Sequence, residues 1–283
     1  MTLTTRFAPS PTGHLHLGHA YSALFAAAAV EKSHGQFLVR IEDIDSGRCR
    51  KEFEDQIFED LKWLGLSWET PVRRQSEHMA DYKAQLDILS DMGILYPCFC
   101  TRADIRREIE ACGHAPHDIP SGPDGPLYPG TCLHLTKSER EDRIASAQPF
   151  ALRLHMSEAI KIAGPLEWHD LDQGRTIARP EIFGDVVLAR KETPTSYHLA
   201  VTLDDHLQDV TLVTRGEDLF HASHIHSLLQ SLFGLNKPQY HHHRLLQDED
   251  GKRFAKRDNA VPLKEIKESG TTAVEIRQQL GFS

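Results

Sequence analysis

The stretch RFAPSPTGHLHLGHAYSALFAAAAV, residues 6–30, changes character halfway along. Its first half is rich in Pro and Gly, as turns are, and its second half is an alanine-rich apolar run that favours a helix. His16, Gly18 and His19 lie at the junction. Backbone N–H groups at a helix N-terminus favour anions, and two imidazole donors would strengthen that preference. Gly18 has no side chain to keep a flat ligand from the backbone. The alternative is that the histidines only cap and pack the turn.

Alternating helix and strand patterns follow this junction. The alanine-rich helix is expected over residues 21–35, and the apolar run 36–43 is typical of a buried strand. Apolar residues at helical spacing predict helices over 50–65 and 78–93, and residues 94–100 read as another strand. Strands separated by helices predict a parallel α/β sheet with crossover helices.

Regular patterns weaken between Thr101 and Leu171, where Pro and Gly accumulate. We interpret this segment as an insertion between two halves of the sheet. The elements expected after it are strand and helix over 185–205, a strand over 209–216, a helix over 219–234, a strand over 239–246 and a final helix over 273–281.

Composition restricts the class of protein. The chain has 283 residues, a net charge of −9 and five cysteines. We expect a cytoplasmic protein without membrane contact, because no apolar stretch approaches a membrane span and the first ten residues lack a signal-peptide core. An odd number of cysteines argues against a disulfide framework and leaves metal binding or buried thiols, with Cys49 expected to be structural. The acidic balance means that any nucleic-acid contact must be local.

A cationic loop lies far along the chain. Residues 251–258, GKRFAKRD, hold four basic residues, Lys256 among them. Such a loop can close over a polyphosphate, where lysine acts as a point charge. Taken alone, the loop fits a solvated basic surface better. Together with the turn at His16, which favours anions, and with a parallel sheet between the two, the loop indicates phosphate binding.

Cysteines in the insertion have the spacing of metal ligands. Cys98 and Cys100 are followed by a distant Cys132, and tetrahedral zinc takes thiolate and imidazole ligands. The residues that could complete the set by spacing alone are Cys112, His114 and His117. The alternative is that the cysteines are buried, reduced and bind no metal. The run HHHRLL, residues 241–246, is not expected to form a joint metal site, because neighbours in a strand point to opposite faces.

In combination, these motifs resemble those of the class I aminoacyl-tRNA synthetases, and among them the glutamyl group. The H-x-G-H turn, RIEDID (40–45), the segment 192–216 and the late lysine loop occur in the family's order between Arg6 and about Asn259. The resemblance implies a Rossmann-type α/β catalytic domain with a zinc-bearing insertion and a small C-terminal helical piece. It also implies a monomer that activates L-glutamate with ATP and Mg²⁺ to glutamyl-adenylate.

Only 27 residues follow Lys256, whereas glutamyl synthetases continue with a large helical domain that reads the anticodon. The chain therefore resembles their truncated paralogues, which attach glutamate to queuosine, a modified base in the anticodon of tRNA(Asp). A short glutamyl-tRNA synthetase that charges a tRNA 3′ end and a non-catalytic paralogue that senses glutamate or ATP are the alternatives. The expected parts are the two catalytic halves 1–97 and 172–240, the insertion 98–171, and the lysine-loop region with a helix at 241–283, without an anticodon-binding domain.

The resemblance also assigns site residues. The expected glutamate pocket comprises Arg6, Ala8, Ser10, Glu42, Tyr197 and Arg215. The expected ATP site comprises His16, Gly18, His19 and Lys256, and the expected zinc ligands are Cys98, Cys100, Tyr128 and Cys132. Glutamate brings two carboxylates and one ammonium, so two arginines and one carboxylate, Glu42, balance it. The alternative for Arg6 and Glu42 is a structural ion pair.

Two positions depart from the family's pattern. Val201 replaces an Asn that contacts the substrate in glutamyl synthetases, and Ala255 replaces a Ser of the lysine loop. Each change removes one polar contact. We expect an activity that is intact but slow.

Overall fold

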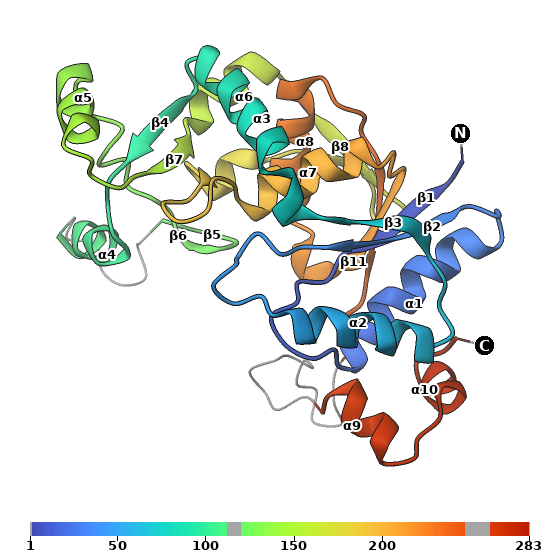
Figure 1. Cartoon of the computed structure of the whole chain (residues 1–283). Coiled ribbons are helices and arrows are strands. Elements are labelled where there is room, and N and C mark those ends of the chain that lie inside the picture. The colour runs from blue at the N-terminus through green and yellow to red at the C-terminus, as the bar shows by residue number, and fades with distance from the viewer. Residues whose placement is uncertain (1, 112–119, 247–260, 283) are drawn as a thin grey trace.

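The computed structural model of the protein describes residues 2–111, 120–246 and 261–282 (Figure 1). Two sets of parallel strands form its centre. The first sheet contains, in spatial order, β1 (Thr4–Phe7), β2 (Gln36–Ile41) and β3 (Glu69–Arg74). The second contains β11 (Leu212–Gly216), β12 (Gln239–His243) and β8 (Glu167–Asp170), with β9 (Gly174–Ile177) antiparallel at its edge.

The two parallel sheets lie next to each other. The backbone N–H of Thr211 donates to the carbonyl oxygen of Thr4 at 3.0 Å, and the N–H of Thr4 donates to Thr211 Oγ1 at 2.9 Å. The spatial order is therefore β3-β2-β1-β11-β12-β8-β9. The chain moves from β1 toward one edge and from β11 toward the other. Sheets of this kind bind ligands at the carboxyl ends of the two strands where the order reverses.

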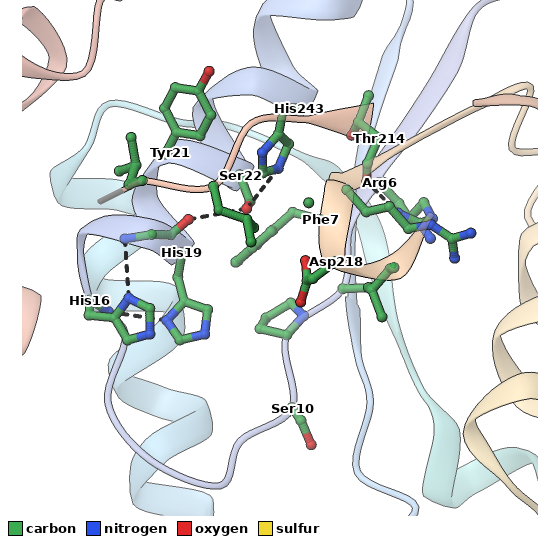
Figure 2. Close-up of a pocket in the computed structure, with 18 of the residues that line it drawn as sticks. Arg6, Phe7, Ser10, His16, His19, Tyr21, Ser22, Thr214, Asp218 and His243 are labelled. Atoms are coloured by element: carbon green, nitrogen blue, oxygen red, sulfur yellow. Dashed lines mark hydrogen bonds between the residues drawn. The ribbon is translucent and has the colours of Figure 1, made fainter. Parts of the chain in front are cut away.

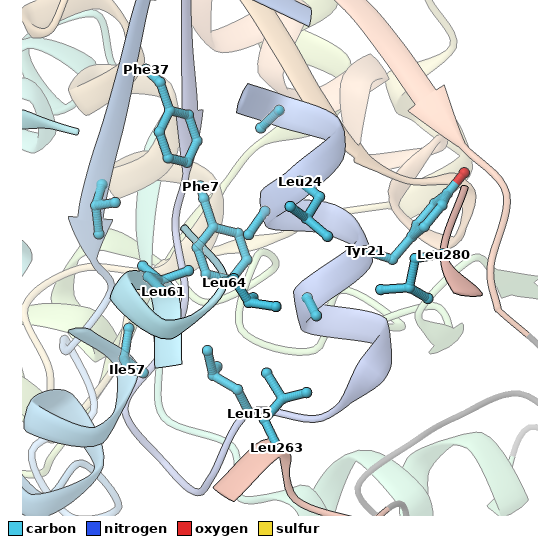
Figure 3. Packing of buried hydrophobic residues seen from close by; sticks show 14 of the residues in the cluster. Phe7, Leu15, Tyr21, Leu24, Phe37, Ile57, Leu61, Leu64, Leu263 and Leu280 are labelled. Carbon is cyan, nitrogen blue, oxygen red and sulfur yellow. The ribbon is translucent and has the colours of Figure 1, made fainter. Parts of the chain in front are cut away.

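Helices cover this sheet and bury its apolar side chains. Those of the N-terminal half and of the C-terminus are α1 (Leu17–Glu31), α2 (Lys51–Trp63), α9 (Leu263–Glu268) and α10 (Ala273–Gln279). Leu24, Leu61 and Leu263 come from three of them and meet in one cluster, each 1% exposed or less (Figure 3). Burying a leucine contributes about 1.5–3 kcal/mol, so this cluster fixes α1 against the sheet and holds the C-terminal helices to α1 and α2.

A second core joins α3 (Met79–Asp91), α6 (Met156–Ala163), α7 (Tyr197–Leu207) and α8 (Ala222–Phe233) to a small antiparallel sheet. That sheet contains β10 (Val187–Ala189), β7 (Ala151–Leu154) and β4 (Leu95–Cys98), in this order. Between β4 and β7 the chain forms α4 (Arg102–Ala111), β5 (Ser121–Gly122), β6 (Gly125–Pro126) and α5 (Lys137–Ala145).

The prediction that residues 94–100 extend the parallel sheet is wrong. β4 pairs antiparallel with β7, with Leu95 opposite Leu154. The parallel strand of that region is β3, which the sequence pattern missed because Glu69–Arg74 is a polar, partly exposed edge strand without an apolar run. Helix α1 also begins four residues earlier than predicted, at Leu17, because His16 caps it.

Strand pairing does not follow the predicted boundary at residue 171. β8 lies before this boundary and pairs with β12 of the parallel sheet, whereas β10 lies after it and pairs with β7. Spacing along the chain does not reveal such pairings. The helices predicted over 50–65 and 219–234 end close to their predicted last residues, α2 at Trp63 and α8 at Phe233, and Gly65 and Gly234 have positive φ, +77° and +65°, which glycine adopts without a steric cost. The helix predicted over 21–35 ends earlier than expected, at Glu31. None of the helices in the described ranges is long and apolar enough to cross a membrane.

Candidate active site

A pocket of about 430 Å³ opens where the strand order reverses (Figure 2). Its walls come from the carboxyl ends of β1, β2, β11 and β12 and from the N-terminus of α1. The structure brings together nine predicted site residues there: Arg6, Ala8, Ser10, His16, Gly18, His19, Glu42, Tyr197 and Arg215. Lys256 and Ala255 lie outside the described residues.

The two histidines cap α1. The N–H of Gly18 donates to His16 Nδ1 at 3.1 Å, and the N–H of His16 donates to His19 Nδ1 at 3.2 Å. A nitrogen that accepts a hydrogen bond carries no proton, so each neutral ring has its proton on Nε2. The first turn of α1 contains no acidic residue to offset the positive end of the helix dipole. The interpretation that the histidines cap the turn is therefore correct for their Nδ1 atoms. Nε2 is consequently the hydrogen-bond donor of each ring.

Buried ions anchor the amino-acid end of the pocket. Arg6 donates from Nε to Asp205 Oδ1 at 2.9 Å, and Arg40 donates to the same oxygen at 2.8 Å. Arg40, which is fully buried, also donates to Glu42 Oε1 at 3.1 Å. Among the described residues no ion pair joins Arg6 to Glu42, so Glu42 is held by Arg40 instead. Burial would raise the pKa of Asp205, but Arg6 and Arg40 outweigh it and hold that pKa low.

Arg215 has a different environment. Its guanidinium is buried, with the residue 6% exposed, and donates to His242 Nε2 at 3.2 Å, His226 Nδ1 at 3.1 Å and Ser223 Oγ at 2.6 Å. Within the described part of the chain it forms no ion pair with a carboxylate. Arg6 and Arg40 lie beside Asp205 and Glu42, and Asp204 Oδ2 is a further 3.9 Å from Arg40 Nε. Among these buried arginines of the described residues, Arg215 is therefore the one whose charge has no paired carboxylate.

The amino-acid end of the pocket is completed by Tyr197, Ser10 and Glu42. Ser196 caps α7 by accepting the N–H of Leu199 and so fixes where Tyr197 begins the helix. Burial raises the pKa of Tyr197, which keeps its phenol protonated. Ser10 Oγ donates to the carbonyl oxygen of Glu42 at 2.7 Å. Burial also raises the pKa of Glu42, against the opposing effect of Arg40, and a bound ammonium would favour its ionised form.

Val201 is buried and does not line this pocket. The position that departs from the family's pattern is therefore filled by a side chain that belongs to the protein core.

The four predicted zinc ligands lie together in the insertion. Tyr128 Oη is 3.4 Å from Cys98 Sγ and 3.6 Å from Cys100 Sγ, and the sulfurs of Cys100 and Cys132 are 3.4 Å apart. Thiolates about 2.3 Å from a tetrahedral zinc ion are about 3.8 Å from one another, so these separations fit such an ion. The three thiols form a group that could hold a metal. The ligands considered on spacing alone, Cys112, His114 and His117, lie outside the described residues.

The three adjacent histidines of β12 point to alternate faces, as predicted. His241 and His243 both contact the ring of Phe25, at 4.7 and 5.1 Å between centroids, whereas His242 contacts Arg215 on the other side.

Sequence analysis missed the residues that hold the arginines. Arg40 carries a charge inside the apolar run QFLVRI, and Asp205 follows another aspartate in the mostly buried helix α7. Charged residues in segments that otherwise predict burial were the available signal. His226 and His242 had no such signal, because a histidine in a helix or strand is compatible with many environments.

The chain matches the family of class I tRNA synthetase (E and Q) catalytic domains over residues 2–281. It is 47% identical to the Glutamyl-Q tRNA(Asp) synthetase of Rhodobacter capsulatus, covering 99% of this chain and 100% of that protein. It is 36% identical to the glutamate–tRNA ligase of Hydrogenobaculum sp., over 94% of this chain but only 55% of that protein.

A solved structure shares this fold. The glutamate-tRNA synthetase of Elizabethkingia anophelis superposes with a TM-score of 0.77 and 28% identity, covering 92% of this chain and 53% of that one. Together with the pocket at the strand-order reversal, these similarities establish that the chain belongs to the glutamyl-Q tRNA(Asp) synthetase family of class I aminoacyl-tRNA synthetases, which are ligases.

Proposed function

We propose that the chain activates L-glutamate with ATP and transfers the glutamyl group to queuosine in the anticodon of tRNA(Asp). The observation that carries the choice of amino acid is Arg215, a buried guanidinium without a carboxylate partner among the described residues. The choice of acceptor rests on the 47% identity to a protein named Glutamyl-Q tRNA(Asp) synthetase, against 36% for the glutamate–tRNA ligase of Hydrogenobaculum.

Arg215 holds the side-chain carboxylate of glutamate in this proposal. Discrimination against glutamine is strongest where a cation has no other anion nearby, because an amide leaves that cation unmatched. Arg6 is already paired with Asp205 at 2.9 Å and discriminates less. It therefore serves the α-carboxylate, and Glu42 takes the α-ammonium.

Activation joins the α-carboxylate to ATP. A carboxylate oxygen attacks the α-phosphorus in line, the bond to the bridging oxygen breaks, and pyrophosphate leaves. His16 and His19 donate from Nε2 to the phosphates at the N-terminus of α1, and Lys256 stabilises the leaving pyrophosphate. Mg²⁺, which accompanies ATP, offsets phosphate charge. The protein supplies position and electrostatic stabilisation, so no protein nucleophile is needed.

Transfer follows when an acceptor hydroxyl attacks the carbonyl carbon of the adenylate and AMP leaves. A second cavity of about 720 Å³ adjoins the first and shares Tyr197, Asp218 and Leu219 with it. This cavity supplies room for a nucleoside that has been turned out of an RNA loop.

We also propose that Cys98, Cys100, Tyr128 and Cys132 hold one zinc ion. The ligand separations support this assignment, as does the chemistry of three thiols and a phenol. Zinc there would tie the end of β4 to the segment before α5. Its role is to stabilise the insertion, because the ion would have no open position for substrate.

ATP–pyrophosphate exchange tests the activation step. With glutamate and Mg²⁺ we expect exchange without RNA, and with glutamine we expect kcat/KM to be lower by a factor of at least about ten, which corresponds to about 1.4 kcal/mol. A Lys256→Ala variant should lose kcat far more than it loses glutamate affinity, because its contact forms in the transition state. Equal exchange with both amino acids would refute the assignment of the pocket.

Charging of tRNA(Asp) tests the acceptor. Transcripts with guanosine and natural tRNA with queuosine are compared at equal concentration, with labelled glutamate. Only the queuosine form should be labelled. Labelling of a glutamate tRNA at its 3′ end instead would identify a glutamate–tRNA ligase.

A further inference from the structure

Within the described ranges, every hydrogen-bond partner of Arg215 is uncharged. Its three hydrogen bonds end on two imidazoles and one hydroxyl, and the three partner residues are each 8% exposed or less: Ser223, His226 and His242. Carboxylates occupy the corresponding positions around Arg6 and Arg40, namely Asp205, Glu42 and, at 3.9 Å from Arg40 Nε, Asp204. The protein therefore uses two different ways to hold arginines within one pocket.

Hydrogen bonding fixes the protonation state of His226. Arginine can only donate, so His226 Nδ1 accepts and carries no proton. Its Nε2 then carries the proton and donates to His198 Nδ1 at 3.3 Å. An imidazolium would direct an N–H at the guanidinium and would add a like charge. Burial and the charge of Arg215 lower the pKa of His226 well below 6.5, which keeps the ring neutral.

His242 is fixed from its other side. Its Nε2 accepts from Arg215 Nε, so its proton lies on Nδ1 and is donated to Asp170 Oδ2 at 2.7 Å. Asp170 is fully buried and also accepts the backbone N–H groups of Asp172 and Gln173. The nearest acid on this side is thus separated from Arg215 by a whole imidazole ring and makes no direct pair with it.

We propose that His226 and His242 determine the amino-acid specificity: as neutral acceptors they orient Arg215 without matching its charge, which keeps that charge for the side-chain carboxylate of glutamate. An acid in either place would also orient the guanidinium. Its negative charge would, however, offset the charge of Arg215 in place of the substrate's carboxylate. This inference rests on the proposed function, because it assumes that Arg215 binds that carboxylate.

Two nearly isosteric substitutions separate orientation from charge. His226→Asn keeps a neutral oxygen that can accept from Arg215, whereas His226→Asp puts a carboxylate at the same position. ATP–pyrophosphate exchange gives KM and kcat for glutamate and for glutamine with each variant. Only the charge differs between the two proteins, so a purely structural role predicts the same kinetics for both.

We expect KM for glutamate to rise about thirtyfold or more in His226→Asp relative to His226→Asn, which corresponds to about 2 kcal/mol. The value of kcat should differ by less than about threefold, because the lost interaction is present in both ground and transition states. The preference for glutamate over glutamine, as a ratio of kcat/KM values, should narrow by a similar factor.

His241→Asp and His241→Asn form the control pair. His241 lies next to His242 in β12 but contacts Asp172 and the ring of Phe25, so both variants should keep the wild-type preference. Thermal unfolding reports whether each protein is folded. If His226→Asp does not fold, Ser223→Asp and Ser223→Asn provide the same comparison from the third partner of Arg215.

Equal KM and equal preference in the matched Asp and Asn variants would overturn the inference. Absence of glutamate-dependent exchange in the unmodified protein would instead refute the proposed function, so the two failures are distinguishable.

Discussion

Substituting Asp205 by asparagine removes one negative charge from the buried centre of the site and leaves its shape unchanged. Asp205 accepts from Arg6 at 2.9 Å and from Arg40 at 2.8 Å, and the three side chains are 5%, 0% and 8% exposed for Arg6, Arg40 and Asp205. In the variant Arg40 keeps Glu42 and Gln208, each at 3.1 Å, and Asp204 at 3.9 Å, whereas Arg6 keeps, among the described residues, only the carbonyl oxygen of Thr214 at 3.0 Å.

Breaking a buried ion pair by removing one charge costs about 3–5 kcal/mol, because the other charge remains desolvated. Coulomb's law gives a consistent size: two charges about 4 Å apart interact by about 4 kcal/mol at an effective dielectric constant of about 20. No cavity forms, since asparagine has nearly the volume of aspartate. We therefore expect Asp205→Asn to lower the free energy of unfolding by about 3–5 kcal/mol.

Urea denaturation at pH 7.5 measures this change. The midpoint should fall with an unchanged dependence on urea, which indicates lower stability rather than a different unfolded state. Asp209→Asn is the control, because Asp209 is an exposed residue just beyond the same helix and its positive φ of +51° is one that asparagine adopts as readily as aspartate. This change should stay within about 0.5 kcal/mol. A loss below about 1 kcal/mol for Asp205→Asn would show that Asp205 does not hold the two arginines as argued.

Two further predictions concern the metal and the pH dependence. Elemental analysis should find about one zinc per chain. The Cys98→Ser and Cys132→Ser variants should lose this zinc, and the control variant Cys49→Ser should keep it. Zinc retained in both ligand variants would exclude the site. Burial lowers the pKa of both His224 and His242 from 6.5 to about 4. The unfolded chain therefore binds protons at these positions at a higher pH than the folded chain. The free energy of unfolding should consequently fall as pH drops from 6.5 toward 4, by up to about 1.4 kcal/mol per pH unit for each histidine. Urea denaturation at several pH values measures it, and a free energy that stays constant between pH 6.5 and 5 would contradict the neutral state of both rings.

Local patterns were sufficient to predict much of the architecture. The helix after His16, the strand 36–41 and the stop at Gly65 follow from apolar spacing and turn chemistry, which act within a few residues. Pairing between strands depends on segments far apart in sequence. Residues 94–100 were therefore expected in the parallel sheet, although β4 pairs with β7 from more than fifty residues later.

The candidate site likewise contains residues that sequence motifs can predict and residues that they cannot. Residues that would touch the substrate lie in motifs that can be compared with a family, and the structure brings nine of them into one pocket. Their supports come from separate elements: Asp205 from α7, Arg40 from β2 and His226 from α8. Such residues have no fixed spacing to the groups that they hold, so only their three-dimensional arrangement reveals them.

Glutamate transfer to an isolated anticodon stem-loop tests the central claim most directly. An RNA stem-loop of tRNA(Asp) that carries queuosine is incubated with the protein, ATP, Mg²⁺ and labelled glutamate, beside the same loop with guanosine and a full tRNA without its 3′-terminal nucleotides. We expect label on the queuosine loop and on the shortened queuosine tRNA, and none on the guanosine loop. Label that disappears with the 3′-terminal nucleotides would contradict the account and assign the chemistry to the tRNA 3′ end.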